Sequence, residues 1–235
     1  MLFIAFTLFT RYSLLNTVGA VSLSTLVKVS SVSTAKTRVR NESEFVLELV
    51  RRTVRNSNPE DVYIYDSLST REFNPTTGRV DAVNANTDFV TLYSKMIGAN
   101  TDGNEIHFRP YGYDKWICIG FFYSTESEAD ENGVRHGYIL KTTKDSLQNA
   151  HESCFASGRA NQNYIILNSA TVAINDFNIA YTETTTNDYL IRFDLEAESL
   201  NWYLGNKAPV QNEVFRQTVV QNYGLHLLQK WMKLN

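Results

Sequence analysis

The strongest constraint on the fold is a series of short segments rich in β-branched and aromatic residues, which begins at Val62 and continues to Val220. Such residues fit the pleated, half-buried surface of a β-sheet. We expect strands at Val62–Leu68, Phe89–Met96, Glu105–Phe108, Trp116–Phe122, Tyr138–Thr142, Tyr164–Asn168, Thr171–Ile174, Tyr189–Phe193, Leu200–Leu204 and Glu213–Val220. Short strands with no long helical segment between them predict a closed or layered all-β domain. The pattern leaves a barrel, a sandwich and a trefoil open.

Turn-forming residues separate these segments. Turns are predicted at residues 74–78, 102–104, 132–133 and 205–206, where Asn, Asp, Gly and Pro gather. The connection over residues 124–135 differs, because it is acidic and has little apolar content. We interpret it as a solvated hairpin insertion, and a site for a cation or a basic partner is the alternative.

Two helices are predicted outside the strand series. Apolar residues recur every three to four positions over 43–55, behind Ser43 as a cap, which predicts a short amphipathic helix. The residues on its apolar face are Phe45, Leu47, Val50 and Val54. Residues 223–235 predict a helical tail that docks on the domain or on a partner. The face of this tail comprises Leu225, Leu228, Trp231 and Met232.

The first twenty residues are typical of a secretion signal. An apolar run over 2–9 is followed by Val18-Gly19-Ala20, whose small residues suit cleavage after Ala20. No basic residue precedes the run and Arg11 interrupts it, so a buried strand or helix is the alternative. Residues 21–40 show neither a period nor a breaker, and we interpret them as a mobile arm. No later segment reaches about 18 to 20 apolar residues, so we expect a released protein without a membrane span.

Two further features agree with export. Asn41-Glu42-Ser43 is a sequon for glycosylation of Asn41. Cys118 and Cys154 are the only cysteines. Outside the cell they can form one disulfide, which would add about 3 to 4 kcal/mol of stability on the chain-entropy model, whereas in the cytosol they would be small buried hydrophobes.

Composition and motifs argue against nucleic-acid binding and against catalysis. Lys and Arg number 22 against 25 Asp and Glu, which gives a net charge of -3 and no general attraction to polyanions. The four histidines lie in unrelated contexts, and neither a His-x-x-x-His nor a Cys-x-x-Cys spacing occurs. In the segment 151–154, a histidine and a cysteine lie too close together on one strand to face each other as a catalytic pair. We therefore expect a protein that is not an enzyme and that has no cofactor and no metal.

Several motifs in a fixed order add a family resemblance. They are Val62-Tyr63-Ile64-Tyr65, Thr77-Gly78-Arg79-Val80-Asp81-Ala82, Trp116-Ile117-Cys118-Ile119, Glu152-Ser153-Cys154-Phe155, Asn161-Gln162-Asn163-Tyr164, and Trp202-Tyr203-Leu204-Gly205-Asn206-Lys207 continued through Gln211 to Phe215. From about Phe45 to Val220 the chain resembles the fibroblast growth factors, and within them a subgroup whose middle strand reads Tyr-Ile-Cys-Met.

The resemblance implies a β-trefoil, with three pseudo-repeats of four strands over residues 57–221. Residues 1–20 would then be the signal peptide, 21–56 the arm and short helix, and 222–235 the tail. It also implies a secreted ligand of a receptor tyrosine kinase, with heparan sulfate as co-ligand and a Cys118–Cys154 disulfide. Tyr65, Asn163 and Tyr164 match receptor-contacting positions, although either tyrosine can instead pack on its own barrel. The predicted helix over 43–55 is similar in position to a segment that packs on the receptor.

The positions that match the glycosaminoglycan site are Asn206, Lys207, Gln211 and Arg216. Pro209 and Glu213 depart from the basic character of that stretch, so we expect weak heparan sulfate binding or a site moved to the basic arm and helix. The alternative functions are a secreted β-rich lectin without signalling activity, and a self-assembling coat-like protein that retains residues 1–20.

Overall fold

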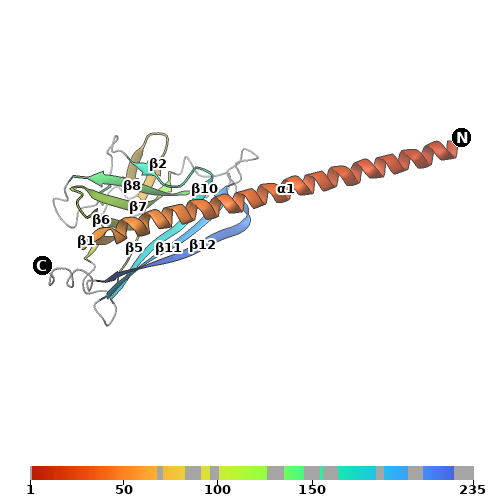
Figure 1. Ribbon diagram of the computed structural model, residues 1–235. Helices are drawn as coiled ribbons and strands as arrows, with labels where there is room; N and C mark the ends of the chain where they lie inside the picture. Colours follow the sequence, from red (N-terminus) through yellow and green to blue (C-terminus); the bar gives the residue numbers. More distant parts are fainter. Residues whose placement is uncertain are drawn as a thin grey trace. The chain divides into compact units, whose positions relative to one another are not determined.

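The computed structural model describes residues 2–67, 71–82, 91–95, 101–125, 135–145, 154–155, 164–183, 188–200 and 209–224. One long helix, α1 (Leu2–Arg55), precedes a series of strands (Figure 1). The strands are β1 (Ser57–Ser67), β2 (Arg71–Asn74), β3 (Arg79–Ala82), β4 (Thr91–Lys95), β5 (Thr101–Gly103), β6 (Glu105–Pro110), β7 (Trp116–Ser124), β8 (Gly137–Lys144), β9 (Ile165–Ile166), β10 (Val172–Glu183), β11 (Asp188–Leu200) and β12 (Pro209–Gly224). The all-β class is thus confirmed for the chain that follows α1.

The helix is much longer than the sequence predicted. The helix expected over 43–55 is confirmed as the end of α1, and residues 21–40, which we interpreted as an arm without a period, are helical as well. No glycine or proline interrupts residues 21–55. Hydroxyl groups bond back to the preceding turn, where Thr25 donates to the Val21 carbonyl at 2.8 Å and Thr34 to the Ser30 carbonyl at 2.9 Å. These bonds satisfy the polar side chains without breaking the helix.

The chain divides into two compact units, residues 1–38 and 39–235. The boundary lies within α1, so the last turns of the helix belong to the unit that contains the strands. Helical spacing explains why, since the buried side chains of this part recur on one face. They are Val39, Ser43, Val46, Leu47, Val50 and Val54. Phe45, which was predicted on this face, is instead 58% exposed.

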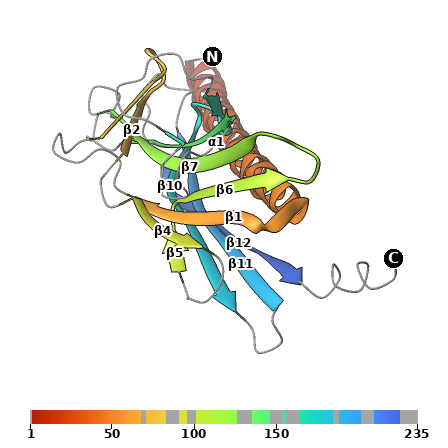
Figure 2. The ribbon, with the colours of Figure 1, turned by 90° about the vertical axis from the view of Figure 1, so that its left-hand side faces the viewer.

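The first sheet contains eight of the described strands. Six of them follow the order β3-β2-β7-β6-β1-β4, while β8 pairs with β7 and β9 pairs with β8. Figure 2 shows β7, β6, β1 and β4 side by side. All pairings in this sheet are antiparallel except that of β2 with β7, which is parallel and joins Glu72 to Tyr123 and Phe73 to Ser124. The turn between β2 and β3 is the one predicted at 74–78, and Gly78 has a φ of 65° there.

The second sheet contains β12, β11, β10 and β5 in that order. Strands β10 and β11 extend well beyond the segments predicted at 171–174 and 189–193, and they pair from Val172↔Ser199 to Glu183↔Tyr189. Their apolar side chains alternate with polar ones, as in a strand with one buried face. The extension was missed because the exposed positions are Asn, Asp, Glu and Arg, which resemble loop sequence when read without the alternation.

The trefoil topology is not confirmed. A trefoil repeats one four-strand unit three times, whereas the described strands form two sheets of unequal size, and β2 pairs with β7 in parallel. Other expectations lie outside the described residues: the turns at 132–133 and 205–206, the part of the expected Leu200–Leu204 strand that follows Leu200, most of the acidic insertion, and the tail from 225 onward.

The main core contains side chains from α1 and from both sheets. Strand β7 separates it from a second apolar cluster. Ile117, Ile119 and Phe121 belong to the main core, while Cys118 and Phe122 belong to the second cluster. Because successive side chains of a strand point to opposite faces, both faces of β7 are buried. This explains the unbroken apolar run of the Trp116–Phe122 segment, which would otherwise alternate with polar residues.

We predict that Gly137→Ala destabilises the fold. At this position a Cβ atom would lie 1.8 Å from the Ile174 carbonyl oxygen, so the backbones of β8 and β10 would have to separate. Overpacking of this kind costs about 1 to 3 kcal/mol. Chemical denaturation should show the loss, with Gly19→Ala as the control because a Cβ there meets nothing within 4 Å. Equal stability of Gly137→Ala and wild type would contradict the close approach of the two strands.

Candidate functional site

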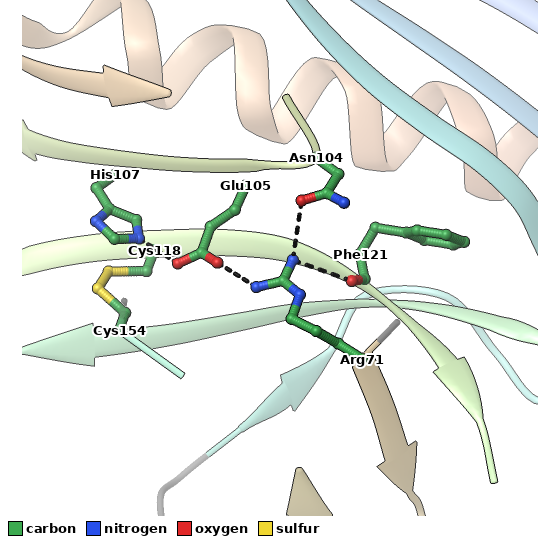
Figure 3. A network of polar contacts seen from close by, with 7 residues as sticks. All are labelled: Arg71, Asn104, Glu105, His107, Cys118, Phe121 and Cys154. Carbon is green, nitrogen blue, oxygen red and sulfur yellow. Dashed lines mark hydrogen bonds and ion pairs between the residues drawn. A yellow bond between two sulfur atoms is a disulfide. The ribbon is translucent and has the colours of Figure 1, made fainter. Parts of the chain in front are cut away.

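The candidate site is a network of buried polar side chains beside the disulfide (Figure 3). It joins Arg71 at the start of β2, Glu105 and His107 on β6, and the disulfide of Cys118 with Cys154. Arg71, Glu105 and His107 are at most 2% exposed. Charged groups are almost never fully buried unless they are paired, so this cluster is the most unusual chemistry among the described residues.

Strand alternation places Glu105 and His107 together. Ile106 and Phe108 belong to the main core. Because successive side chains of a strand point to opposite faces, Glu105 and His107 lie on the other face of β6. That face would be exposed in a two-layer domain. Here the second apolar cluster covers it, and this cluster includes Phe73 of β2 and Phe155 next to the disulfide.

Arg71 holds the network together. One guanidinium nitrogen, Nη1, donates to Glu105 Oε2, and Nη2 donates to Asn104 Oδ1 at 3.2 Å and to the Phe121 carbonyl oxygen at 3.1 Å. The guanidinium also lies 4.3 Å from the centre of the Phe122 ring. This side chain thus uses both its planar donor fork and its ability to stack on an aromatic face, and a lysine could not replace it.

Glu105 bridges Arg71 and His107. Its Oε2 accepts from Arg71, and its Oε1 contacts Nε2 of His107. Burial alone would raise the pKa of the Glu105 carboxyl, but the charges and hydrogen bonds of Arg71 and His107 outweigh burial and lower this pKa to about 2. The carboxylate is therefore ionised at any physiological pH, and it can hold the His107 ring in a fixed orientation.

The expected disulfide between Cys118 and Cys154 is present, with the two Cα atoms 6.2 Å apart. Cys118 lies opposite His107 in the register of β6 and β7. A ring nitrogen of His107 and the two sulfur atoms all lie within 4.8 Å of one another, and all three residues are buried. Chemically, the site combines a fixed imidazole, a carboxylate and a redox-active sulfur pair.

The residues matched to receptor contacts do not form one described surface. Tyr65 lies in β1, paired with Tyr93 of β4 and Glu105 of β6, and Asn163 is outside the described residues. The Tyr164 ring lies 5.8 Å from that of Phe155 and 6.3 Å from that of Phe73, at the edge of the second apolar cluster. Tyr164 therefore packs on its own domain, the alternative that the sequence left open, and its receptor role stays a prediction.

The positions matched to heparan sulfate contacts are only partly described. Gln211 and Arg216 lie in β12, and Arg216 pairs with Glu196 of β11, while Asn206 and Lys207 are outside the described residues. Asn41 lies in α1 with an exposed side chain, but Ser43 of the same sequon is 1% exposed. Glycosylation of Asn41 would therefore require α1 to open locally.

Sequence reasoning missed Arg71, Glu105 and His107. The signal for two of them was present, because Glu105-Ile106-His107-Phe108 alternates polar and apolar residues on a predicted strand. Such alternation ordinarily indicates a face in contact with water. The sequence did not indicate that another part of the chain covers this face.

The N-terminal part of α1 carries a second notable feature. Among the described residues, one helical segment within Thr17–Arg55 is long and apolar enough to cross a membrane by length and composition, a property that a secretion signal near the N-terminus shares. Several of its apolar side chains are more than half exposed. They are Val18, Val21, Leu23, Leu26, Val27 and Val29.

We predict a loss of stability in acid that depends on Glu105. Because its pKa is lowered on folding, from an ordinary value near 4.5 to about 2, the carboxylate stabilises the fold above pH 4.5, and this stabilisation disappears as the pH falls toward 2. The loss amounts to about 3 kcal/mol at about 1.4 kcal/mol per pH unit. Denaturation between pH 6 and pH 2 should show a shallower dependence for Glu105→Gln.

The same Glu105→Gln variant should lose about 3 to 5 kcal/mol at neutral pH, since it leaves Arg71 buried without its anion. Asp114→Asn, which changes an exposed carboxylate, serves as the control and should keep the wild-type pH dependence. Identical pH profiles for Glu105→Gln and wild type would show that the carboxylate is not held ionised by the network.

Comparison of the chain with protein-family models, with curated proteins and with solved structures gives no match. The resemblance to the fibroblast growth factors therefore stays a prediction from the motifs.

Proposed function

We propose that this protein is an extracytoplasmic binding domain held at a membrane by the N-terminal part of α1. The observation that carries this proposal is the helix itself, which is unbroken from Leu2 to Arg55 and contains a segment apolar enough to cross a bilayer. A cleaved signal has an apolar region of only about 7 to 15 residues. Here only Arg11 is charged between Leu2 and Val27, a span of about 26 residues, compared with about 20 needed for a membrane helix.

The charges around this segment suit an anchor. Residues 12–27 carry no charge, and they lie between Arg11 and Lys28. At about 1.5 Å per residue this stretch covers about 24 Å, slightly less than the hydrocarbon core of a bilayer. Long basic side chains at both ends can reach the headgroups and so make up the difference.

The disulfide supports one side of the membrane for the strand-containing unit. Lys28, Lys36, Arg38 and Arg40 follow the segment, and such basic residues favour the cytoplasmic side. Whole domains, however, are translocated largely regardless of nearby charge. Disulfides persist in oxidising compartments and are rare in the cytosol. The Cys118–Cys154 bond therefore supports placing the strand-containing unit outside the cytoplasm.

We predict that the full-length chain of 26.8 kDa stays with membranes after extraction with alkaline carbonate. The double variant Val21→Asp/Leu23→Asp should move to the soluble fraction, because each charge within the span and away from its ends costs about 2.5 to 3.5 kcal/mol. Phe45→Asp, which changes an exposed apolar residue outside the span, is the matched control and should remain in the membrane. Recovery of a soluble protein that begins at Val21 would refute the anchor.

The second candidate is a secreted ligand of a fibroblast growth factor receptor, acting with heparan sulfate. The disulfide favours it, because the resemblance implies a bond between the same two cysteines. A secreted lectin without signalling activity would share the same export route. In the ligand proposal, residues 1–20 are removed, the domain over residues 57–221 is a β-trefoil, and Tyr65, Asn163 and Tyr164 contact the receptor.

For this second candidate we predict saturable binding to a receptor ectodomain, stronger with heparan sulfate. Tyr164→Phe is the informative variant, because it removes the hydroxyl and keeps the ring that packs on Phe155 and Phe73. A contacting hydroxyl should cost about 1 kcal/mol or more of binding energy, roughly a fivefold weaker affinity. Tyr111→Phe, at an exposed loop position, should bind as wild type. Absence of binding by folded protein with and without heparan sulfate would exclude the ligand and favour the lectin.

A further inference from the structure

We propose that the reduced form of this protein holds a zinc ion between Cys118, Cys154 and His107. A ring nitrogen of His107 and the two sulfur atoms lie within 4.8 Å of one another, and the three residues are buried. They come from β6, from β7 and from the segment at 154–155. This inference goes beyond the proposed function, because it concerns the interior of the strand-containing unit when the Cys118–Cys154 bond is open.

Once the disulfide is reduced, small side-chain movements bring the three atoms to the separations of a tetrahedral metal site. Zinc binds cysteine sulfur at about 2.3 Å and histidine nitrogen at about 2.0 to 2.1 Å, so its ligand atoms lie roughly 3.3 to 3.8 Å apart. In the intact disulfide the two sulfur atoms are about 2.0 Å apart, so after reduction they must separate by roughly 2 Å, and the His107 nitrogen must approach them by up to about 1 Å. Two thiolates with one imidazole form a soft donor set that favours zinc over magnesium or calcium.

Glu105 and Arg71 supply the surroundings that such a ligand requires. Nε2 of His107 contacts Glu105 Oε1, and a carboxylate in this position fixes the ring and leaves Nδ1 as the nitrogen that would bind the metal. Glu105 is itself held by Arg71, which also donates to the Phe121 carbonyl oxygen. The histidine is thus positioned by a rigid part of the first sheet and not by a loop.

The charges also balance. A dithiol reductant transfers two electrons and two protons to the Cys118–Cys154 bond, which becomes two thiols while the reductant becomes a disulfide. Zinc then displaces the two thiol protons. Two thiolates neutralise Zn²⁺, and the Arg71–Glu105 pair remains neutral as a whole, so no net charge is added to the interior. The ion would keep the two sulfur atoms together whenever the bond is open.

Cobalt(II) is the probe for this site. Full-length protein in detergent is reduced with a dithiol, freed of the reductant without oxygen, and titrated with Co²⁺. We expect one Co²⁺ per chain, with the visible absorption bands of a tetrahedral ion, a sulfur-to-cobalt charge-transfer band, and displacement by Zn²⁺. The oxidised protein should show none of these bands. Zn²⁺ should also raise the thermal midpoint of the reduced protein.

Variants separate a built site from loose thiol binding. Cys118→Ser and Cys154→Ser should abolish the bands, and His107→Gln should weaken Co²⁺ binding at least tenfold while keeping two thiols. Glu105→Gln should weaken it less, because it alters only the support of the histidine. Equal Co²⁺ binding by wild type and His107→Gln, or its absence in folded reduced protein, would overturn the proposal. If the reduced chain unfolds, Zn²⁺ must restore its circular dichroism, and failure to do so would also overturn it.

Discussion

The buried ion pair between Arg71 and Glu105 is the constraint on which the arrangement of the first sheet depends. Two opposite charges in an apolar interior gain little net stability over a well-packed apolar pair, because desolvation offsets most of their attraction. Breaking the pair is costly, however, since the remaining charge stays buried. A pair that gains little when formed but costs much when broken disfavours any packing in which the two charges do not meet. Here it requires the start of β2 to meet β6, and the bond from Arg71 to the Phe121 carbonyl ties the same residue to β7.

This requirement gives a physical account of the parallel pairing between β2 and β7. A hairpin of two short strands, β2 and β3, has little apolar surface with which to select its position. Arg71 supplies the missing specificity, since its donors must reach Glu105, Asn104 and the backbone of β7 together. The ring of Phe73, two residues later, then lies in the second apolar cluster. The hydrogen bonds of Arg71 and the burial of Phe73 thus favour the same register between β2 and β7, in which Glu72 pairs with Tyr123.

Local patterns predicted the strands well and their environment poorly. The segment Trp116–Phe122 was recognised because an unbroken apolar run needs burial on both faces, and the structure confirms it. The segment from Glu105 was also recognised as a strand, but its polar face was expected in water. Whether that face is covered depends on β2 and on the segment at 154–155, which are distant in sequence. Arg71 could not be predicted as a site residue, because an isolated arginine between Thr70 and Glu72 is typical of an exposed loop.

The helix shows the complementary limitation. Its last turns were predicted from apolar spacing, because there the tertiary contacts impose a period, as at Val46, Val50 and Val54. Residues 21–38 belong to the other compact unit, and their Ser/Thr/Val composition shows no period that would mark one buried face. A bilayer would impose a different rule: it surrounds a helix on all sides and therefore requires apolar content without periodicity. The lack of a period that first suggested a mobile arm is thus what a membrane helix would show, and hydroxyls bonded to the preceding turn, such as that of Thr25, are compatible with that environment.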